Sequence, residues 1–284
     1  MTAPRNPHRA RLAARLRALR AAAGLSGNRF AQQLGWPQPR VSKLETGKQI
    51  PTDDDLNAWL TATGAGKAQA TELAELLSAA RIEYATWRGV QRTAGGLAGR
   101  HAERATWEAA TTHIAEYQPA MIPGLVQTAA YARALLISPL TSAMDITAPD
   151  TDALVAERVK RQEILYQPGR RIEVILGEAA LWNTPGTVAT LLGQLDRLIS
   201  FAALPSLVIG VVSRAVPMPI APLANFAVYD NDFVLFETLT GEQRLDDQDE
   251  VAIYIKAFDQ LRDASTTGQG ALDLIRHVID ELRS

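Results

Sequence analysis

The sequence predicts an α+β protein, with an all-α N-terminal domain of five helices, a helical connector and a C-terminal mixed α/β domain with a small sheet. Apolar residues recur at steps of three and four in the first 66 residues, whereas the β-branched runs typical of strands lie between residues 171 and 237. The length of 284 residues also exceeds that of one typical domain. We therefore expect domains at residues 1–66 and 105–284, joined by a connector at 67–104.

The first two helices are expected to end at glycines. Leu12, Leu16 and Leu19 line one apolar face of the first helix, which Gly24 ends. Ser26 is a suitable N-cap for the second helix, because its hydroxyl can accept a bond from a free amide of the first turn. One small core is expected to contain Leu16, Leu19, Leu25, Phe30, Leu34, Val41 and Leu44.

The third helix begins near Pro37 or Gln38, since proline is tolerated in a first turn, and ends before Gly47. Its outward residues can all donate hydrogen bonds: Gln38, Arg40, Ser42 and Lys43. Glutamine and arginine can each make two bonds to a base edge in the major groove of DNA. A fourth helix is expected over residues 51–60, with Thr52 as its cap.

Charge is divided unevenly along the chain. The first 50 residues contain ten Lys or Arg and the single acid Glu45, a balance of +9. The whole chain has 29 basic and 31 acidic residues, so residues 51–284 hold 19 against 30. A basic N-terminal region attracts phosphates, whereas the acidic remainder is repelled by DNA. The alternative, a merely solvated helix face, would normally mix both signs.

Four sequence motifs in this region are considered together: LRALRAAAGLS, FAQQLG, VSKLETGK and PTDDDL. Over about residues 9–64 they resemble the Xre-type, or lambda-repressor-like, helix-turn-helix domain. The resemblance implies a transcription regulator that binds double-stranded DNA, and a homodimer on a pseudo-palindromic operator is expected because single modules bind weakly. It assigns base reading to Gln38, Pro39, Arg40 and Lys43, and phosphate contacts to Ser26, Asn28, Arg29, Ser42 and Lys48.

One position departs from that family. Its members often have glutamine directly after the cap of the second helix, as a phosphate ligand, whereas this chain has Gly27. The anchor is therefore missing or is replaced by Asn28 or Arg29. Pro39 likewise has no side-chain donor.

The connector is expected to be helical from Lys67 to about Arg92, with Leu73, Leu77 and Trp87 on one face. A flexible joint is then expected at Gly95, Gly96 and Gly99, followed by a helix over residues 102–115.

The C-terminal domain is expected to mix helices with short strands. Strands are expected at residues 171–177, 206–213, 226–229 and 233–237, and Asp230, Asn231 and Asp232 indicate a hairpin turn between the last two. Helices are expected from about Gln127 and at residues 151–166, 187–203, 248–264 and 271–282.

The C-terminal domain contains several sequence motifs in the order found in one family: EYQPAMIPGLVQTAAYARALL, RVKRQEIL, LGEAALW, FETLTGE and DEVAIYIKAFDQLRDAS. Over about residues 105–275 they resemble the antitoxin-like C-terminal domain that follows Xre-type motifs in many actinomycete regulators. The biochemistry of that domain is undefined. The resemblance implies pairing with a small acidic partner protein, and it names no small-molecule effector.

No group of residues indicates catalysis, so we expect neither an enzyme nor a cofactor or metal site. His8, His101, His113 and His277 lack ligand spacing, and no nucleophile or phosphate-loop motif occurs. Acidic residues at 242–250 lack the spacing of a calcium loop, and a helix cap explains them more simply. Six aromatic residues could line a pocket, although core packing is the stronger interpretation: Tyr117, Trp182, Phe226, Tyr229, Phe233 and Phe236.

An alternative remains open, in which the C-terminal domain is a small-molecule sensor, or a metabolite-acting enzyme fused to a DNA-binding leader. The chain has no cysteine and no apolar run long enough for a membrane span. We therefore expect a cytoplasmic, nucleoid-associated protein that does not enter a membrane.

Overall fold

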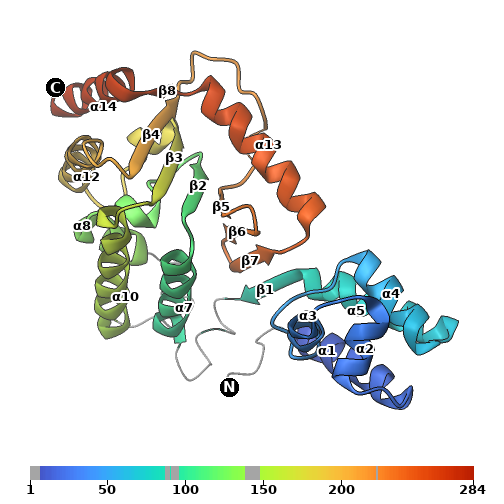
Figure 1. The fold of residues 1–284 in the computed structure, drawn as a ribbon. Helices are drawn as coiled ribbons and strands as arrows, with labels where there is room; N and C mark the ends of the chain where they lie inside the picture. The colour runs from blue at the N-terminus through green and yellow to red at the C-terminus, as the bar shows by residue number, and fades with distance from the viewer. Residues whose placement is uncertain (1–6, 87–89, 91–95, 138–147, 222) are drawn as a thin grey trace. The chain divides into compact units, whose positions relative to one another are not determined.

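The computed structural model describes residues 7–86, 90, 96–137, 148–221 and 223–284 (Figure 1). Contacts between its residues divide the chain into two compact units: Met1–Glu83 with Leu245–Asp247, and Tyr84–Arg244 with Gln248–Ser284. We call them the first unit and the second unit and describe each by itself. The α+β class is confirmed, since the first unit is helical and the second contains a mixed sheet.

The first unit contains five helices: α1 (Pro7–Ala22), α2 (Gly27–Leu34), α3 (Gln38–Glu45), α4 (Asp53–Thr63) and α5 (Lys67–Arg81). Their ends follow the local signals. Ser26 caps α2 by accepting a bond from the Arg29 amide at 3.3 Å. Thr52 and Asp55 form a reciprocal capping box at the start of α4. The chain turns at Gly24, Gly35 and Gly47, whose φ angles are 71°, 67° and 67°.

A single apolar cluster holds these five helices together. Trp59 of α4 is fully buried, and its ring centroid lies 4.5 Å from that of Phe30. The indole nitrogen of Trp59 donates a hydrogen bond to the Leu16 carbonyl at 3.1 Å. Of the seven expected core residues, only Leu25 and Leu34 are partly rather than fully buried. The predicted small core therefore exists and centres on a tryptophan of the fourth helix.

The boundary between domains differs from the expected one. Helix α5 packs against α1 and contributes Leu73, Leu76, Leu77 and Ala80 to the apolar core of the first unit, so it is not a separate connector. The helix expected to reach Arg92 ends at Arg81, where strand β1 (Ile82–Thr86) begins. The expected joint is also absent at two of its glycines, since helix α7 (Gly96–Ala110) includes positions 96 and 99. Trp87 and Gly95 lie outside the described residues.

An eight-stranded sheet runs in the order β1-β7-β6-β5-β2-β3-β4-β8. Besides β1, its strands are β2 (His113–Gln118), β3 (Arg171–Gly177), β4 (Leu207–Val212), β5 (Phe226–Tyr229), β6 (Phe233–Thr238), β7 (Gly241–Leu245) and β8 (Thr266–Thr267). Strands β2, β3 and β4 are parallel to one another, whereas β5 is antiparallel to both β2 and β6. Strand β2 therefore lies at the border between a parallel and an antiparallel half.

Helices cover the two faces of this sheet unequally. One face packs against α7, α8 (Ala129–Leu136), α10 (Ala148–Arg161), α12 (Val188–Phe201) and α14 (Gly268–Arg283), with short turns η1 (Gly124–Val126), η2 (Gln162–Tyr166) and α11 (Ala179–Trp182) between them. The opposite face packs against α13 (Gln248–Ala264), which contacts β2, β4, β5 and β6. Figure 1 shows α13 on one side of the strands and α8, α10 and α12 on the other. We call the first the helix-rich face and the second the α13 face.

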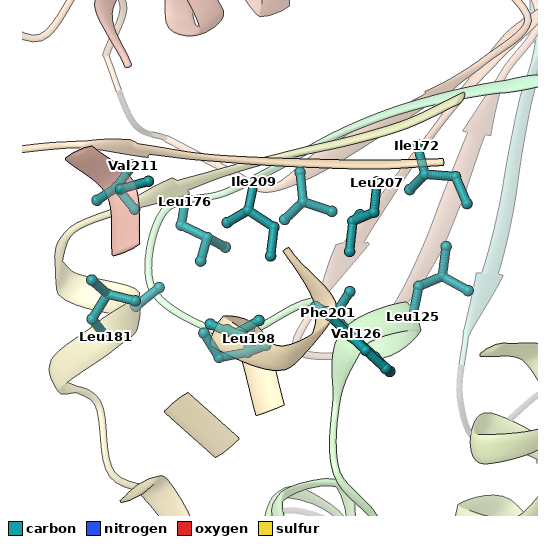
Figure 2. Packing of buried hydrophobic residues seen from close by; sticks show 14 of the residues in the cluster. Leu125, Val126, Ile172, Leu176, Leu181, Leu198, Phe201, Leu207, Ile209 and Val211 are labelled. Carbon is teal, nitrogen blue, oxygen red and sulfur yellow. The ribbon is translucent and has the colours of Figure 1, made fainter. Parts of the chain in front are cut away.

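The parallel half of the helix-rich face is apolar. Figure 2 shows Leu176 of β3 and Ile209 of β4 pointing from the sheet toward Leu198 and Phe201 of α12. All four side chains are at most 5% exposed. This region is the main hydrophobic core of the second unit.

The sheet is larger than predicted, because β1, β2, β7 and β8 were not expected. The omission of β2 matters most, since the helix expected over residues 102–115 ends at Ala110 and a central strand begins at His113. Glu116 and Gln118 are buried in this strand at 3% and 9% exposure. Buried polar residues at alternate positions conceal the apolar pattern that identifies a buried strand.

The hairpin turn between β5 and β6 is confirmed. Asp230 and Asn231 have φ angles of 47° and 62°, the positive values that tight hairpin turns favour. The Asp230 carboxylate accepts bonds from the backbone amides of Thr112 and His113 and from the Thr112 hydroxyl. Partial burial opposes ionisation, but these bonds outweigh it and lower the pKa of Asp230. The turn is thereby tied to the start of β2.

Candidate nucleic-acid interface

Helix α3 presents one polar, exposed row. Val41 and Leu44 are 1% exposed and fix the orientation of the helix against the core. Pro37 is its N-cap residue and Pro39 lies in its first turn. Proline is tolerated there because backbone amides of the first turn have no carbonyl partner within the helix. The exposed side chains of this helix are those of Gln38, Pro39, Ser42 and Lys43. Three of the four residues assigned to base reading therefore share one solvent-facing surface, which we call the α3 surface.

Arg40, the fourth residue assigned to base reading, is bound within the unit. Its Nη2 donates to the Asp55 carboxylate at 2.6 Å, and its guanidinium lies 4.5 Å from the ring centre of Trp36. Its Nε is buried and has no hydrogen-bond partner. The Asp55 side chain is only 4% exposed and also accepts the Thr52 amide at 3.2 Å. Arg40 thus connects α3 to the cap of α4, and only the part of its half-exposed guanidinium that Asp55 does not engage is available to a base.

The residues assigned to phosphate contacts lie on the surface. Ser26, Asn28, Arg29, Ser42 and Lys48 are all exposed. The hydroxyl of Ser26 is engaged as the acceptor of the α2 cap. Backbone amides and exposed side chains at a helix start are suited to an anion.

Gly27, at the first position of α2, has open space where a side chain would project. A Cβ built there meets no atom within 4 Å, and its φ angle is not in the left-handed region. The structure therefore permits the glutamine that is usual in the resembling family.

Replacing Gly27 with glutamine is expected to raise DNA affinity by about twofold to tenfold, the effect of one added hydrogen bond of ~0.5–1.5 kcal/mol. Fluorescence anisotropy with a labelled duplex measures it. Gly27→Ala is the matched control, since both changes remove a helical glycine but only glutamine adds an amide donor. Equal gains for the two variants would show that the effect comes from helix stability rather than from a phosphate contact.

Several arginines of α1 have structural partners. Arg15 forms two bonds to Glu72, at 3.0 and 2.5 Å, and Arg20 forms two to Glu45, at 2.5 and 2.9 Å. The Nε of Arg9 donates to the Gly47 carbonyl at 2.8 Å. By contrast, Arg11 and Arg17 are exposed. The positive charge counted from the sequence is therefore only partly offered to solvent.

The second unit contains a buried group of charged residues on the helix-rich face, over the antiparallel half of the sheet. Arg100 donates to Glu242 at 2.8 and 2.5 Å, and both side chains are at most 5% exposed. Arg161 of α10 forms two bonds to Glu108 of α7, which is completely buried. No local pattern predicts these pairs, because their members lie 142 and 53 residues apart in the sequence.

Comparison with known protein families identifies both parts of the chain. The family model described as "Domain of unknown function (DUF5753)" matches residues 102–277, which is more than half of the chain. The chain belongs to the DUF5753 family. A second model, described as "Helix-turn-helix domain", matches residues 11–76 and so covers the α3 surface. The chain therefore combines an N-terminal helix-turn-helix domain with a C-terminal DUF5753 domain.

Two further comparisons do not identify the chain further. No curated protein matches the chain. Among solved structures, that of TrmBL2, an archaeal chromatin protein described as showing a novel mode of DNA binding, is similar over 88% of this chain and 91% of that one, at 14% identity and a TM-score of 0.31. A likeness this small does not establish a shared fold.

In the DUF5753 domain the six aromatic residues suggested as a pocket do not face one space. Tyr229 stacks on Phe233, with ring centroids 4.8 Å apart, on the helix-rich face. Phe226 contacts Tyr117 and Tyr254 at 5.8 and 5.1 Å, and Phe236 stacks on Tyr254 of α13. Trp182 packs against the main core. The sheet separates these clusters, so core packing explains them.

The histidines are likewise scattered. His113 Nε2 lies 2.8 Å from the Glu173 carboxylate, while His101 Nδ1 lies 3.4 Å from Arg161. Burial and the nearby guanidiniums of Arg158 and Arg161 lower the pKa of His101 well below its usual value, so the ring is neutral at pH 7. Within the described residues, no three potential ligands form a metal-binding group.

None of the described helices is long and apolar enough to cross a membrane.

Proposed function

We propose that this protein is an Xre-type, sequence-specific transcription regulator that binds DNA through the α3 surface. The observation on which this rests is the exposed row of Gln38, Pro39, Ser42 and Lys43, with Val41 and Leu44 buried behind it. In helix-turn-helix domains the second helix of the motif enters the major groove with its N-terminal residues against the bases. Gln38 stands at the first position of α3, where a bidentate contact to adenine is geometrically suited.

Arg40 has a different part in this proposal from Gln38. Its ion pair with Asp55 and its stacking on Trp36 hold the start of α3 in place, so Arg40 first serves as a positioning residue. Lys43, one turn further along the exposed row, provides a flexible cation for a base edge or a phosphate.

Gln38→Ala is expected to weaken binding to the operator by about 1–3 kcal/mol while leaving binding to random DNA nearly unchanged. The operator is first selected from a pool of random duplexes with the full chain, and affinities are then measured by anisotropy at fixed salt. Gln260→Ala, an exposed helical glutamine in the second unit, is the matched control and should change neither affinity. Equal losses on operator and random DNA would refute base reading by Gln38.

We further propose that the protein acts as a homodimer on a pseudo-palindromic operator. Two half-sites about one helical turn apart, in the selected sequences, would support this arrangement. A monomer in sedimentation that binds a single half-site would contradict it.

For the DUF5753 domain we propose a regulatory role without catalysis, in which it binds a small acidic protein partner. The proposal rests on the resemblance to antitoxin-like regulators and on the lack, in the described residues, of a metal-binding group. The alternative role, sensing of a small molecule, is favoured by one observation: Arg158, in the charged group of this domain, bonds to Gln127 and to no carboxylate among the described residues.

A further inference from the structure

On the helix-rich face, the antiparallel half of the sheet is polar, whereas the parallel half is apolar. Glu116 and Gln118 of β2, Glu237 of β6 and Glu242 of β7 meet arginines from α7 and α10 there. Glu116 is 3% exposed, and the Gln118 amide donates to it at 2.9 Å. Burial raises the pKa of Glu116 despite the nearby Arg104. This group lies entirely within the DUF5753 domain.

Three of the four arginines in this group have carboxylate partners. Arg100 binds Glu242 and Glu103, at 2.5 and 2.7 Å. Arg104 binds Glu237 at 2.5 Å and lies 3.4 Å from Glu242. Arg161 binds Glu108. Buried guanidiniums are normally compensated in this way, since an unpaired buried charge is costly.

Arg158 of α10 is the exception. Its Nη1 donates to the amide oxygen of Gln127 at 2.9 Å, and its Nε is buried without a hydrogen-bond partner. Among the residues that the structure describes, no carboxylate forms an ion pair with it, although all three of its neighbours in the group have one. Burial and the positive charge of Arg161 lower its pKa to about 10, although the charges of Glu237 and Glu116 act in the opposite direction, and it is still charged at pH 7.

The Arg158 side chain is packed on one side and partly reached by solvent on another. The aliphatic part of its side chain packs on Gly124, whose added Cβ would lie 3.7 Å from Arg158 Cδ. Arg158 is half-buried rather than enclosed, and the neighbouring Glu237 is 41% exposed. Solvent therefore reaches this end of the group.

The place in the fold is also suited to a ligand. Gln118 is the last residue of β2, which borders the parallel and antiparallel halves, and η1 with Gln127 follows it directly. In open α/β sheets, ligands bind outside the carboxyl ends of strands where the direction of connection changes. A guanidinium presents a planar fork of donors that fits a carboxylate or a phosphate in two parallel bonds.

We propose that Arg158 binds the anionic group, a carboxylate or a phosphate, of a small metabolite, and that the DUF5753 domain is a sensor of that metabolite. The anion supplies the charge partner that Arg158 lacks. Gln127 holds the guanidinium in position, and Glu116 and Gln118 offer polar contacts to the rest of the ligand. The proposal does not depend on DNA binding, because every residue in it belongs to the second unit.

Isothermal titration of the full chain with sodium acetate, and separately with inorganic phosphate, tests the site at constant ionic strength maintained with chloride. One of the two anions is expected to bind saturably with one site per chain, and which one it is distinguishes a carboxylate ligand from a phosphate ligand. Arg158→Gln is expected to weaken this binding at least about tenfold, and Arg158→Lys, which keeps the charge but loses the fork, by several-fold. Arg276→Gln, an exposed arginine of α14, is the matched control and should leave affinity unchanged.

Thermal unfolding provides a second readout. Without added anion, Arg158→Gln is expected to melt at or above the temperature of the wild type, because it removes a half-buried charge that has no ion-pair partner in the described part of the chain. The anion should then raise the melting temperature of the wild type but not that of the variant. Absence of saturable binding by either anion up to about 100 mM, far weaker than a metabolite site requires, or equal binding by wild type and Arg158→Gln, would overturn the proposal. Should Arg158→Gln not fold, equal binding by wild type and Arg158→Lys would overturn it as well.

Discussion

Replacing Trp59 with alanine is expected to destabilise the first unit by about 3–5 kcal/mol, the usual cost of removing a large buried aromatic side chain. Trp59 is fully buried, contacts Phe30 edge-on, lies 6.4 Å from Trp36, and donates a hydrogen bond to Leu16. The substitution leaves a cavity between α1, α2 and α4. It also removes the hydrogen bond that the Leu16 carbonyl of α1 accepts from the indole nitrogen. Because a small domain has only about 5–15 kcal/mol of stability, α3 would lose its support and DNA binding would fall with it.

Hydrogen exchange, resolved by peptide mass spectrometry on the full chain, locates the effect. Amides of α1 to α4 should exchange faster in the variant, while those of β3 and β4 keep their protection. Asn57→Ala, an exposed position on the same helix, should stay within about 0.5 kcal/mol of the wild type. Unchanged protection in α1 to α4 would mean that Trp59 does not hold the unit together.

Glu108→Gln is expected to destabilise the second unit by about 3–5 kcal/mol, because it leaves Arg161 buried without its counter-charge. Glu108 is completely buried and Arg161 is 5% exposed. Two hydrogen bonds join them across α7 and α10, and Arg104 Nε lies 3.6 Å from the same carboxylate. An uncharged amide keeps the shape of the side chain, so the loss reports charge rather than packing.

Urea unfolding measures this change. The double variant Glu108→Leu with Arg161→Met is expected to recover most of the loss, since replacing both charges by apolar groups removes the cost of burying them. Asp259→Asn, in an exposed ion pair with Arg262, is the surface control and should cost at most about 1 kcal/mol. A double variant as unstable as the single one would indicate that packing around these side chains, and not their charge, is decisive.

The helices of the first unit could be predicted because their determinants are local. Ser26, Thr52 and the glycines at positions 24, 35 and 47 mark ends within a few residues of the apolar positions they serve. The same holds for the hairpin at Asp230 and for the apolar strand β3. In each case the residues that determine the structure are neighbours in the sequence.

Features that depend on distant partners could not be predicted. Strand β2 pairs with β3 and β5, so its buried Glu116 and Gln118 make sense only beside arginines from α7 and α10. Arg40 looked like an outward base reader, but its partner Asp55 lies 15 residues away on another helix. Helix α5 likewise joined the first core through contacts with α1 that no local pattern specifies.

The internal partners of the basic residues limit the affinity of the protein for DNA of any sequence. Each phosphate that a free cation neutralises releases a bound salt ion, and the salt dependence of affinity counts these releases. Of the ten Lys and Arg residues in the first 50 positions, Arg9, Arg15, Arg20 and Arg40 are bonded inside the protein. At most six remain for phosphates, one of which, Arg5, lies outside the described residues. The bonds inside the protein therefore lower its general attraction to DNA. The sequence-specific function proposed above then requires contacts with particular bases to supply a larger share of the affinity.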